Sequence, residues 1–96
     1  MVASNVADKG IVICGTGIGI CISANKVIGV RCALCTNEYM AKMASAHNDA
    51  NMIALGNRVL GSGLAIDIVD VWLNTKFEGG RHQNRVNKIM EIEKNN

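Results

Sequence analysis

The 96-residue sequence contains no proline and only one residue each of Trp, Tyr and Phe. Its formal net charge of +2 is too small to predict binding to nucleic-acid phosphates. The longest uncharged stretch, residues 10–25, is interrupted by glycines and is shorter than the roughly 18 apolar residues of a membrane span. Residues 1–5 lack the basic and apolar regions of a signal peptide. We therefore expect a cytoplasmic protein with neither nucleic acid nor membrane as a partner.

Four cysteines invite a metal or disulfide interpretation that their spacing does not support. Cys32 and Cys35 have C-x-x-C spacing, but no second pair follows. The segment 30–35 is typical of a buried strand, in which a free cysteine behaves as a small hydrophobic residue. We predict no metal site.

The length and composition predict one domain over residues 1–96. Hydrophobic residues make up 49% of the chain, a proportion typical of globular proteins. A domain of this size buries a modest core, so a monomer would be marginally stable. We therefore expect a dimer or a higher oligomer when the chain is folded.

Apolar runs alternate with amphipathic segments along the chain. We predict strands over 11–14, 30–35 and 52–55, and helices over 19–26, from 36 or 37 towards 47, over 63–74 and over 81–94. Residues 1–9 show the helical spacing of a lead-in. The positions that mark the turns of the last two helices are Ile66, Val69, Asp70, Leu73, Val86, Ile89, Met90 and Ile92. The alternation predicts an α/β fold with a parallel sheet, whose strands are buried on both faces.

The first predicted strand ends at Cys14 and leads into a glycine-rich turn with Gly15, Gly17 and Gly19. Such turns expose backbone N–H groups that favour an anion or a developing oxyanion. A dinucleotide fingerprint fails because Ile20 stands where the third glycine is required. A thiol beside these N–H groups is well placed for chemistry, although an ordinary strand-to-helix turn is the alternative.

Two further groups of polar residues are candidates for a binding site. Arg81 and Arg85 are four positions apart on one helical face, which favours an anion such as a phosphate monoester over a simply solvated basic face. His47 and Asn48 follow a predicted helix, where His is as often a solvated helix end as a proton-transfer group.

Several segments in order resemble the ribose-5-phosphate isomerase B family, which includes galactose-6-phosphate isomerase subunits. The resemblance covers most of the chain from Gly10 onward. The segments are 13–19 (ICGTGIG) with 24–26 (ANK), 47–51 (HNDAN), 56–59 (GNRV) and 78–86 (EGGRHQNRV).

The resemblance implies an aldose–ketose isomerase that works through an enediol without a metal or organic cofactor. It implies that Cys14 is the proton-shuttling base, that His47 opens the sugar ring and that Asn48 holds sugar hydroxyls. Ile20 stands where a second branch of the family has Glu, so the chain is similar to the cysteine type. The implied contacts to the phosphorylated sugar come from Gly15, Thr16, Gly17, Ile18, Gly19, Arg58, Arg81 and Arg85, some of them across a homodimer interface.

The chain departs from the family at its start. The family has a Rossmann-like three-layer fold with five parallel strands, and its first strand ends in an Asp-His pair. Nothing between Met1 and Gly10 matches that pair. We therefore expect an N-terminally truncated fold with three strands and impaired conversion of ribose 5-phosphate to ribulose 5-phosphate. The alternatives are a catalytically silent oligomerising module and a six-carbon sugar-phosphate isomerase.

Overall fold

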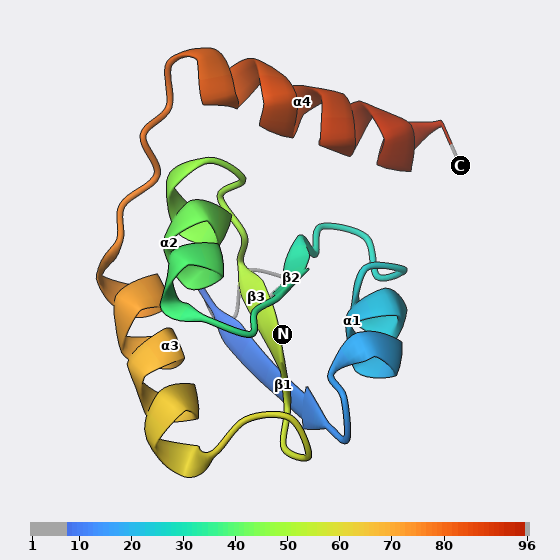
Figure 1. Ribbon diagram of the computed structural model, residues 1–96. Helices are drawn as coiled ribbons and strands as arrows, with labels where there is room; N and C mark the ends of the chain where they lie inside the picture. The colour runs from blue at the N-terminus through green and yellow to red at the C-terminus, as the bar shows by residue number, and fades with distance from the viewer. Residues whose placement is uncertain (1–7, 96) are drawn as a thin grey trace.

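A computed structural model describes residues 8–95, and residues 1–7 of the expected helical lead-in over residues 1–9 lie outside them. Three strands alternate with helices, and two helices follow one another at the C-terminal end (Figure 1). The elements are β1 (Gly10–Cys14), α1 (Ile18–Ala24), β2 (Cys32–Leu34), α2 (Glu38–Ala46), β3 (Met52–Gly56), α3 (Ser62–Asn74) and α4 (Arg81–Lys94).

The strands form one parallel sheet in the order β1-β3-β2. Gly10 pairs with Met52 and Cys14 with Gly56, so the last residues of β1 and β3 lie side by side. Helix α1 lies on one side of the sheet, and α2 and α3 lie together on the other (Figure 1). The predicted three-layer α/β fold with a parallel sheet is therefore confirmed.

Strand β2 is shorter than the predicted run of residues 30–35. The Val30 N–H donates to the Val27 carbonyl, and the Arg31 N–H donates to Asn51 Oδ1 at 2.7 Å. These two N–H groups are used in a turn and in a side-chain contact, so strand pairing begins only at Cys32.

The core lies between the sheet and helices α2 and α3. Ile53 of β3 and Ile68 and Trp72 of α3 are fully buried there. Helix α2 begins where the sequence predicts, because Asn37 Oδ1 accepts the Met40 N–H at 2.8 Å as an N-cap.

The buried faces of α3 and α4 match the marker residues only in part, since Val86 is buried and Val69 packs against the core. In α3 the buried residues are Ile68 and Trp72, whereas Ile66 is 67% exposed. In α4 they are His82 and Val86, whereas Ile92 is 64% exposed. None of the described helices is both long and apolar enough to cross a membrane.

One face of β1 is open, contrary to the prediction that the strands are buried on both faces. By register, Ile11 and Ile13 share a face with Ile53 and Leu55 of β3. Ile11 is nevertheless 43% exposed and Ile13 57% exposed. Helices α2 and α3 cover this face over β3 but leave these two β1 side chains exposed, so an apolar strip lies beside the core.

Candidate active site

Cys14 is the last residue of β1, and its side chain turns toward the loop that follows. The Gly17 N–H donates to Cys14 Sγ at 3.2 Å, and Thr16 Oγ1 accepts the Ile18 N–H at 3.2 Å. The thiol is half-buried, and α1 begins directly after the loop. The predicted strand, glycine loop and helix are therefore present, with Cys14 at the carboxyl end of the strand.

Close packing forces the shape of this loop. Gly17 has a φ of +85°, and a Cβ there would lie 2.7 Å from Leu34 Cδ1 and 3.0 Å from the Leu55 carbonyl carbon. A Cβ at Gly56 would overlap the Thr16 backbone. The loop is thus held against the ends of β2 and β3, which fixes its N–H groups around the sulfur.

These N–H groups change the acidity of the thiol. The backbone N–H of Ile20 contributes most to lowering the pKa of Cys14, partial burial opposes it, and the N–H groups of Gly17 and Thr16 lower it further. Burial instead raises the pKa of Cys35 to about 11 and, together with the neighbouring Cys21, that of Cys32 to about 12. Of these three thiols, Cys14 is therefore the one favoured as a thiolate and as a base.

Arg58 belongs to the same end of the sheet. Its N–H donates to the Gly15 carbonyl at 2.9 Å, and the preceding Asn57 N–H donates to the Cys14 carbonyl at 2.8 Å. The Arg58 side chain lies along Gly15, where a Cβ would be 3.4 Å from Arg58 Cδ. The exposed Arg58 guanidinium therefore lies beside the loop of residues 15–17, called here the cysteine loop, where it can reach an anionic group of a ligand.

A second polar cluster forms where α2 meets α4. The imidazole rings of His47 and His82 stack with their centroids 4.0 Å apart and their planes at 10°. Glu78 Oε1 lies 3.7 Å from His47 Nε2 and 3.4 Å from His82 Nε2. The rings thereby hold the first turn of α4 against the end of α2.

His82 is buried, and its Nδ1 has no hydrogen-bond partner. Burial contributes most to lowering the pKa of His82, followed by the nearby His47, Arg81 and Arg85, while Glu78 raises it. The ring is therefore held in its neutral form. The spacing of four residues between Glu78 and His82 is a signal for this contact, but no sequence pattern indicates that the second histidine is buried.

His47, Glu78 and His82 place one potential metal ligand each within 4.8 Å of one another. The nitrogen lone pairs lie in the ring planes, and these planes are almost parallel, so the lone pairs run side by side instead of converging on one cation. Holding a metal would require one ring to turn. As it stands, the cluster is a stacked pair of imidazole rings beside one carboxylate.

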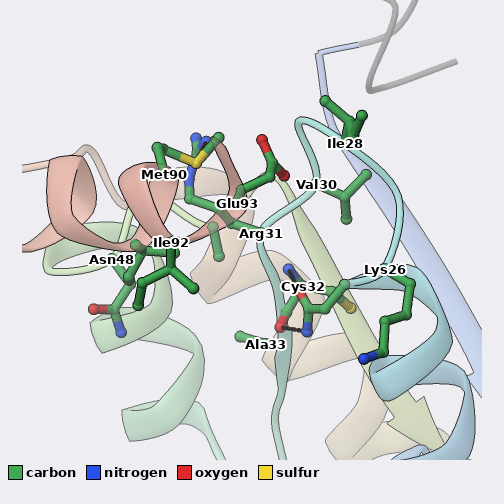
Figure 2. Close-up of a pocket in the computed structure, with 13 residues that line it drawn as sticks. Lys26, Ile28, Val30, Arg31, Cys32, Ala33, Asn48, Met90, Ile92 and Glu93 are labelled. Carbon is green, nitrogen blue, oxygen red and sulfur yellow. Dashed lines mark hydrogen bonds between the residues drawn. The ribbon is translucent and has the colours of Figure 1, made fainter. Parts of the chain in front are cut away.

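The remaining candidate residues lie at the same end as His47. Arg81 and Arg85 are exposed on the first turns of α4, and no side chain caps that helix. Asn48 lines a cavity of about 850 Å³ beneath α4, together with Arg31 and Met90 (Figure 2). The Asn48 amide is suited to bind hydroxyls. The guanidinium groups of Arg81 and Arg85 are suited to bind an anion.

The two groups of candidate residues lie at opposite ends of the sheet. β3 begins at Met52 beside Gly10 and ends beside Cys14, and its length is about 13 Å at the usual rise per strand residue. His47 lies at the end of α2, from which the chain turns into β3 at Met52. One chain therefore does not bring Cys14 and His47 together, and a site that uses both needs two chains.

The sequence and the fold are similar to those of known proteins. A family profile described as Ribose/Galactose Isomerase matches residues 1–89. Ribose-5-phosphate isomerase B of Escherichia coli K12 is 52% identical over 92 residues, which cover 96% of this chain and 62% of that protein. The structure of ribose-5-phosphate isomerase B from Clostridium thermocellum has a TM-score of 0.96 and 64% identity, covering 98% of this chain and 64% of the other. The Mycoplasma genitalium enzyme, solved with bound ribulose-5-phosphate, has a TM-score of 0.94 and 47% identity, covering 99% of this chain and 63% of the other.

The parallel sheet and these similarities define a class of protein, the sugar-phosphate isomerases with a Rossmann-like fold. Within that class, the chain belongs to the ribose/galactose isomerase family. It spans 62–64% of the length of the E. coli, C. thermocellum and M. genitalium proteins.

Proposed function

We propose that the chain forms an aldose–ketose isomerase site that interconverts ribose 5-phosphate and ribulose 5-phosphate. The observation that carries this proposal is the Cys14 thiol, which accepts the Gly17 N–H at 3.2 Å and has a lowered pKa. A thiolate next to fixed N–H donors can remove a proton beside a carbonyl and stabilise the resulting oxyanion.

The proposed reaction is a transfer of one proton between neighbouring carbons. The Cys14 thiolate removes the proton from C2 of the open-chain aldose, and the electron pair moves onto the C1 carbonyl oxygen to give an enediolate. The loop N–H groups from Gly15 to Gly19 stabilise that oxygen. The C2 hydroxyl then passes its proton to the C1 oxygen, and the Cys14 thiol returns the first proton to C1, which produces the ketose and restores the thiolate.

The site is proposed to form between two copies of the chain. One copy supplies Cys14, the loop and Arg58, and its partner supplies His47 with Asn48 and the arginines of α4. The separation of Cys14 and His47 along the sheet supports this arrangement. His47 would transfer the proton that opens the sugar ring, Asn48 would hold sugar hydroxyls, and the arginines would bind the phosphate.

The test is conversion of ribose 5-phosphate by the purified chain, together with exchange of the C2 proton with deuterium from solvent. We expect Cys14→Ser to stop the exchange while binding of the sugar phosphate survives. Cys21→Ser is the matched control, because it changes a thiol on α1 that faces the Cys32 carbonyl at 3.5 Å and not the loop. Full exchange in the Cys14→Ser protein would contradict the proposal.

Two alternatives are distinguished by the same assays. The family description includes galactose, which favours a six-carbon sugar phosphate as a second candidate substrate. Faster exchange with galactose 6-phosphate than with ribose 5-phosphate would support it. The exposed face of β1 at Ile11 and Ile13 favours a catalytically silent oligomerising module. A folded oligomer without exchange on either substrate would support that alternative.

A further inference from the structure

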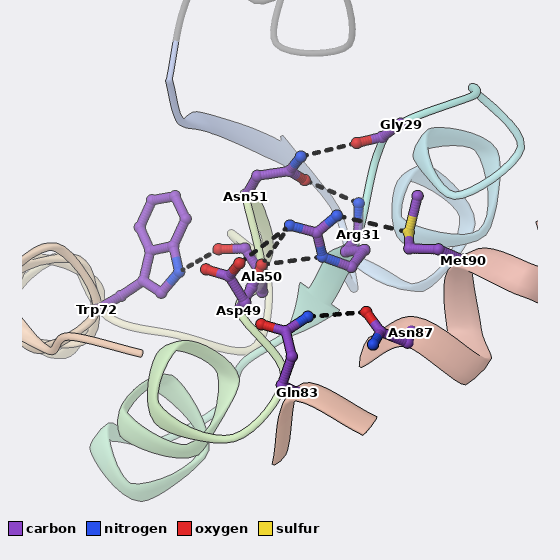
Figure 3. A network of polar contacts seen from close by, with 9 residues as sticks. All are labelled: Gly29, Arg31, Asp49, Ala50, Asn51, Trp72, Gln83, Asn87 and Met90. Atoms are coloured by element: carbon purple, nitrogen blue, oxygen red, sulfur yellow. Dashed lines mark hydrogen bonds and ion pairs between the residues drawn. The ribbon is translucent and has the colours of Figure 1, made fainter. Parts of the chain in front are cut away.

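Arg31 is a charged residue that the sequence analysis did not single out, and it connects three parts of the structure (Figure 3). It lies directly before β2, with its side chain only 19% exposed. Its Nε and one terminal nitrogen both donate to the Asp49 carbonyl, at 3.0 and 2.9 Å. Its other terminal nitrogen donates to Met90 Sδ of α4 at 3.5 Å.

The backbone of Arg31 is fixed independently of its side chain. The Arg31 N–H donates to Asn51 Oδ1 at 2.7 Å, and the Arg31 carbonyl accepts the Asn51 N–H at 3.0 Å. The Asn51 side chain also donates to the Gly29 carbonyl at 2.8 Å. The guanidinium therefore extends from an anchored point at the entry to β2 and β3.

The residue held by this guanidinium has an unfavourable backbone conformation. Asp49 has a φ of +47°, the one positive φ of a non-glycine residue among residues 8–95. This conformation is disfavoured for residues with a side chain, although Asp tolerates it better than most. The two charged hydrogen bonds to the Asp49 carbonyl favour the turn that places Asn48 at the cavity.

We propose that Arg31 is a positioning residue for Asn48. This inference rests on the proposed function, in which Asn48 holds sugar hydroxyls. The two hydrogen bonds from the Arg31 guanidinium, called here the fork, hold the turn at Asp49 in one shape. The Asn48 amide thereby keeps a fixed position relative to the phosphate-binding arginines of α4. In this role Arg31 acts through Asn48, and the role requires no contact of its own with sugar or phosphate.

The experiment compares two ligands on the full chain by calorimetry. The first is ribitol 5-phosphate, a five-carbon polyol phosphate that cannot isomerise, and the second is inorganic phosphate. Arg31→Met retains most of the apolar stem but removes the charge and the fork. We expect it to reduce the preference for ribitol 5-phosphate over inorganic phosphate roughly ten-fold, the effect of losing one or two neutral hydrogen bonds. Binding of inorganic phosphate alone should stay within about two-fold.

Three further variants separate the fork from other effects. Arg31→Lys keeps the charge but cannot form the planar fork, so it should recover only part of the preference, and it serves where Arg31→Met fails to fold. Asp49→Asn removes the ion pair at 3.5 Å but keeps the carbonyl and the turn. Glu93→Gln weakens the contact of α4 with the Gly29 N–H at 2.9 Å. The last two variants should retain the preference of the parent.

The outcomes distinguish a failure of this inference from a failure of the proposed function on which it rests. If the parent binds ribitol 5-phosphate no more tightly than inorganic phosphate, the proposed function fails and the inference fails with it. If the parent shows the preference and both Arg31 variants retain it in full, the inference alone is overturned. A purely structural role would lower the folded fraction and reduce binding of both ligands equally, leaving the preference unchanged.

Discussion

Gly17 in the loop after Cys14 and Gly19 in α1 should respond in opposite ways to the addition of a single methyl group. At Gly17 a Cβ would meet Leu34 Cδ1 at 2.7 Å and the Leu55 carbonyl carbon at 3.0 Å, and φ is +85°. The left-handed conformation costs a non-glycine residue about 1–2 kcal/mol. Overpacking typically costs a further 1–3 kcal/mol or so. Gly17→Ala should therefore lower the free energy of unfolding by about 2–5 kcal/mol.

Gly19 is the matched control, because it lies in α1 and its φ is not positive. A Cβ added at Gly19 would meet no neighbouring atom within 4 Å. Gly19→Ala should raise the free energy of unfolding by about 0.5–1 kcal/mol, because alanine loses less backbone entropy in a helix. Urea denaturation followed by circular dichroism measures both changes. An equal effect of the two substitutions, or a Gly17→Ala protein as stable as the parent, would refute the described packing of the loop.

Three other predictions concern charges and protons. Because its pKa is lowered, Cys14 should react with iodoacetamide at neutral pH well before Cys35, whose pKa is raised to about 11; equal rates by mass spectrometry would show that the loop does not activate the thiol. Arg81→Ala or Arg85→Ala should weaken binding of inorganic phosphate about ten- to a hundred-fold in calorimetry, with partial recovery by Lys, and unchanged binding would place the phosphate site elsewhere. Because the pKa of His82 is lowered, the unfolded chain takes up the proton first as pH falls below 6.5, and the free energy of unfolding should decrease. His82→Gln should reduce this dependence of the free energy of unfolding on pH. An identical pH dependence in the variant would be inconsistent with a buried neutral ring.

The sequence predicted the elements well where one local signal dominates. The strand before Cys14, the Asn37 cap and the bounds of α4 follow from apolar runs, capping chemistry and glycines. Strand β2 is shorter than the predicted run of residues 30–35 because Asn51, twenty positions away, accepts a hydrogen bond from the Arg31 N–H. Long-range side-chain contacts of this kind leave no periodic pattern in the sequence.

The buried face of α3 could not be chosen from periodicity, because apolar residues occur nearly all around that helix. Trp72 and Ile68 are buried because α2 packs there, which depends on tertiary structure. The candidate site shows the same limit. The resemblance to the isomerase family assigned Cys14 and His47 to one site, but only the parallel register shows that they lie at opposite ends of the sheet.

The central claim is that the two groups of candidate residues act together across two chains. The most direct test mixes two impaired variants, one carrying Cys14→Ser and the other carrying Arg81→Ala with Arg85→Ala. Each variant alone should lose most of the C2 proton exchange on ribose 5-phosphate. Random dimers from an equal mixture contain one intact site in each mixed dimer, so exchange should return to about a quarter of the parent rate. A mixture that remains as inactive as its components, with mixed dimers demonstrated by mass spectrometry, would contradict a site shared between two chains.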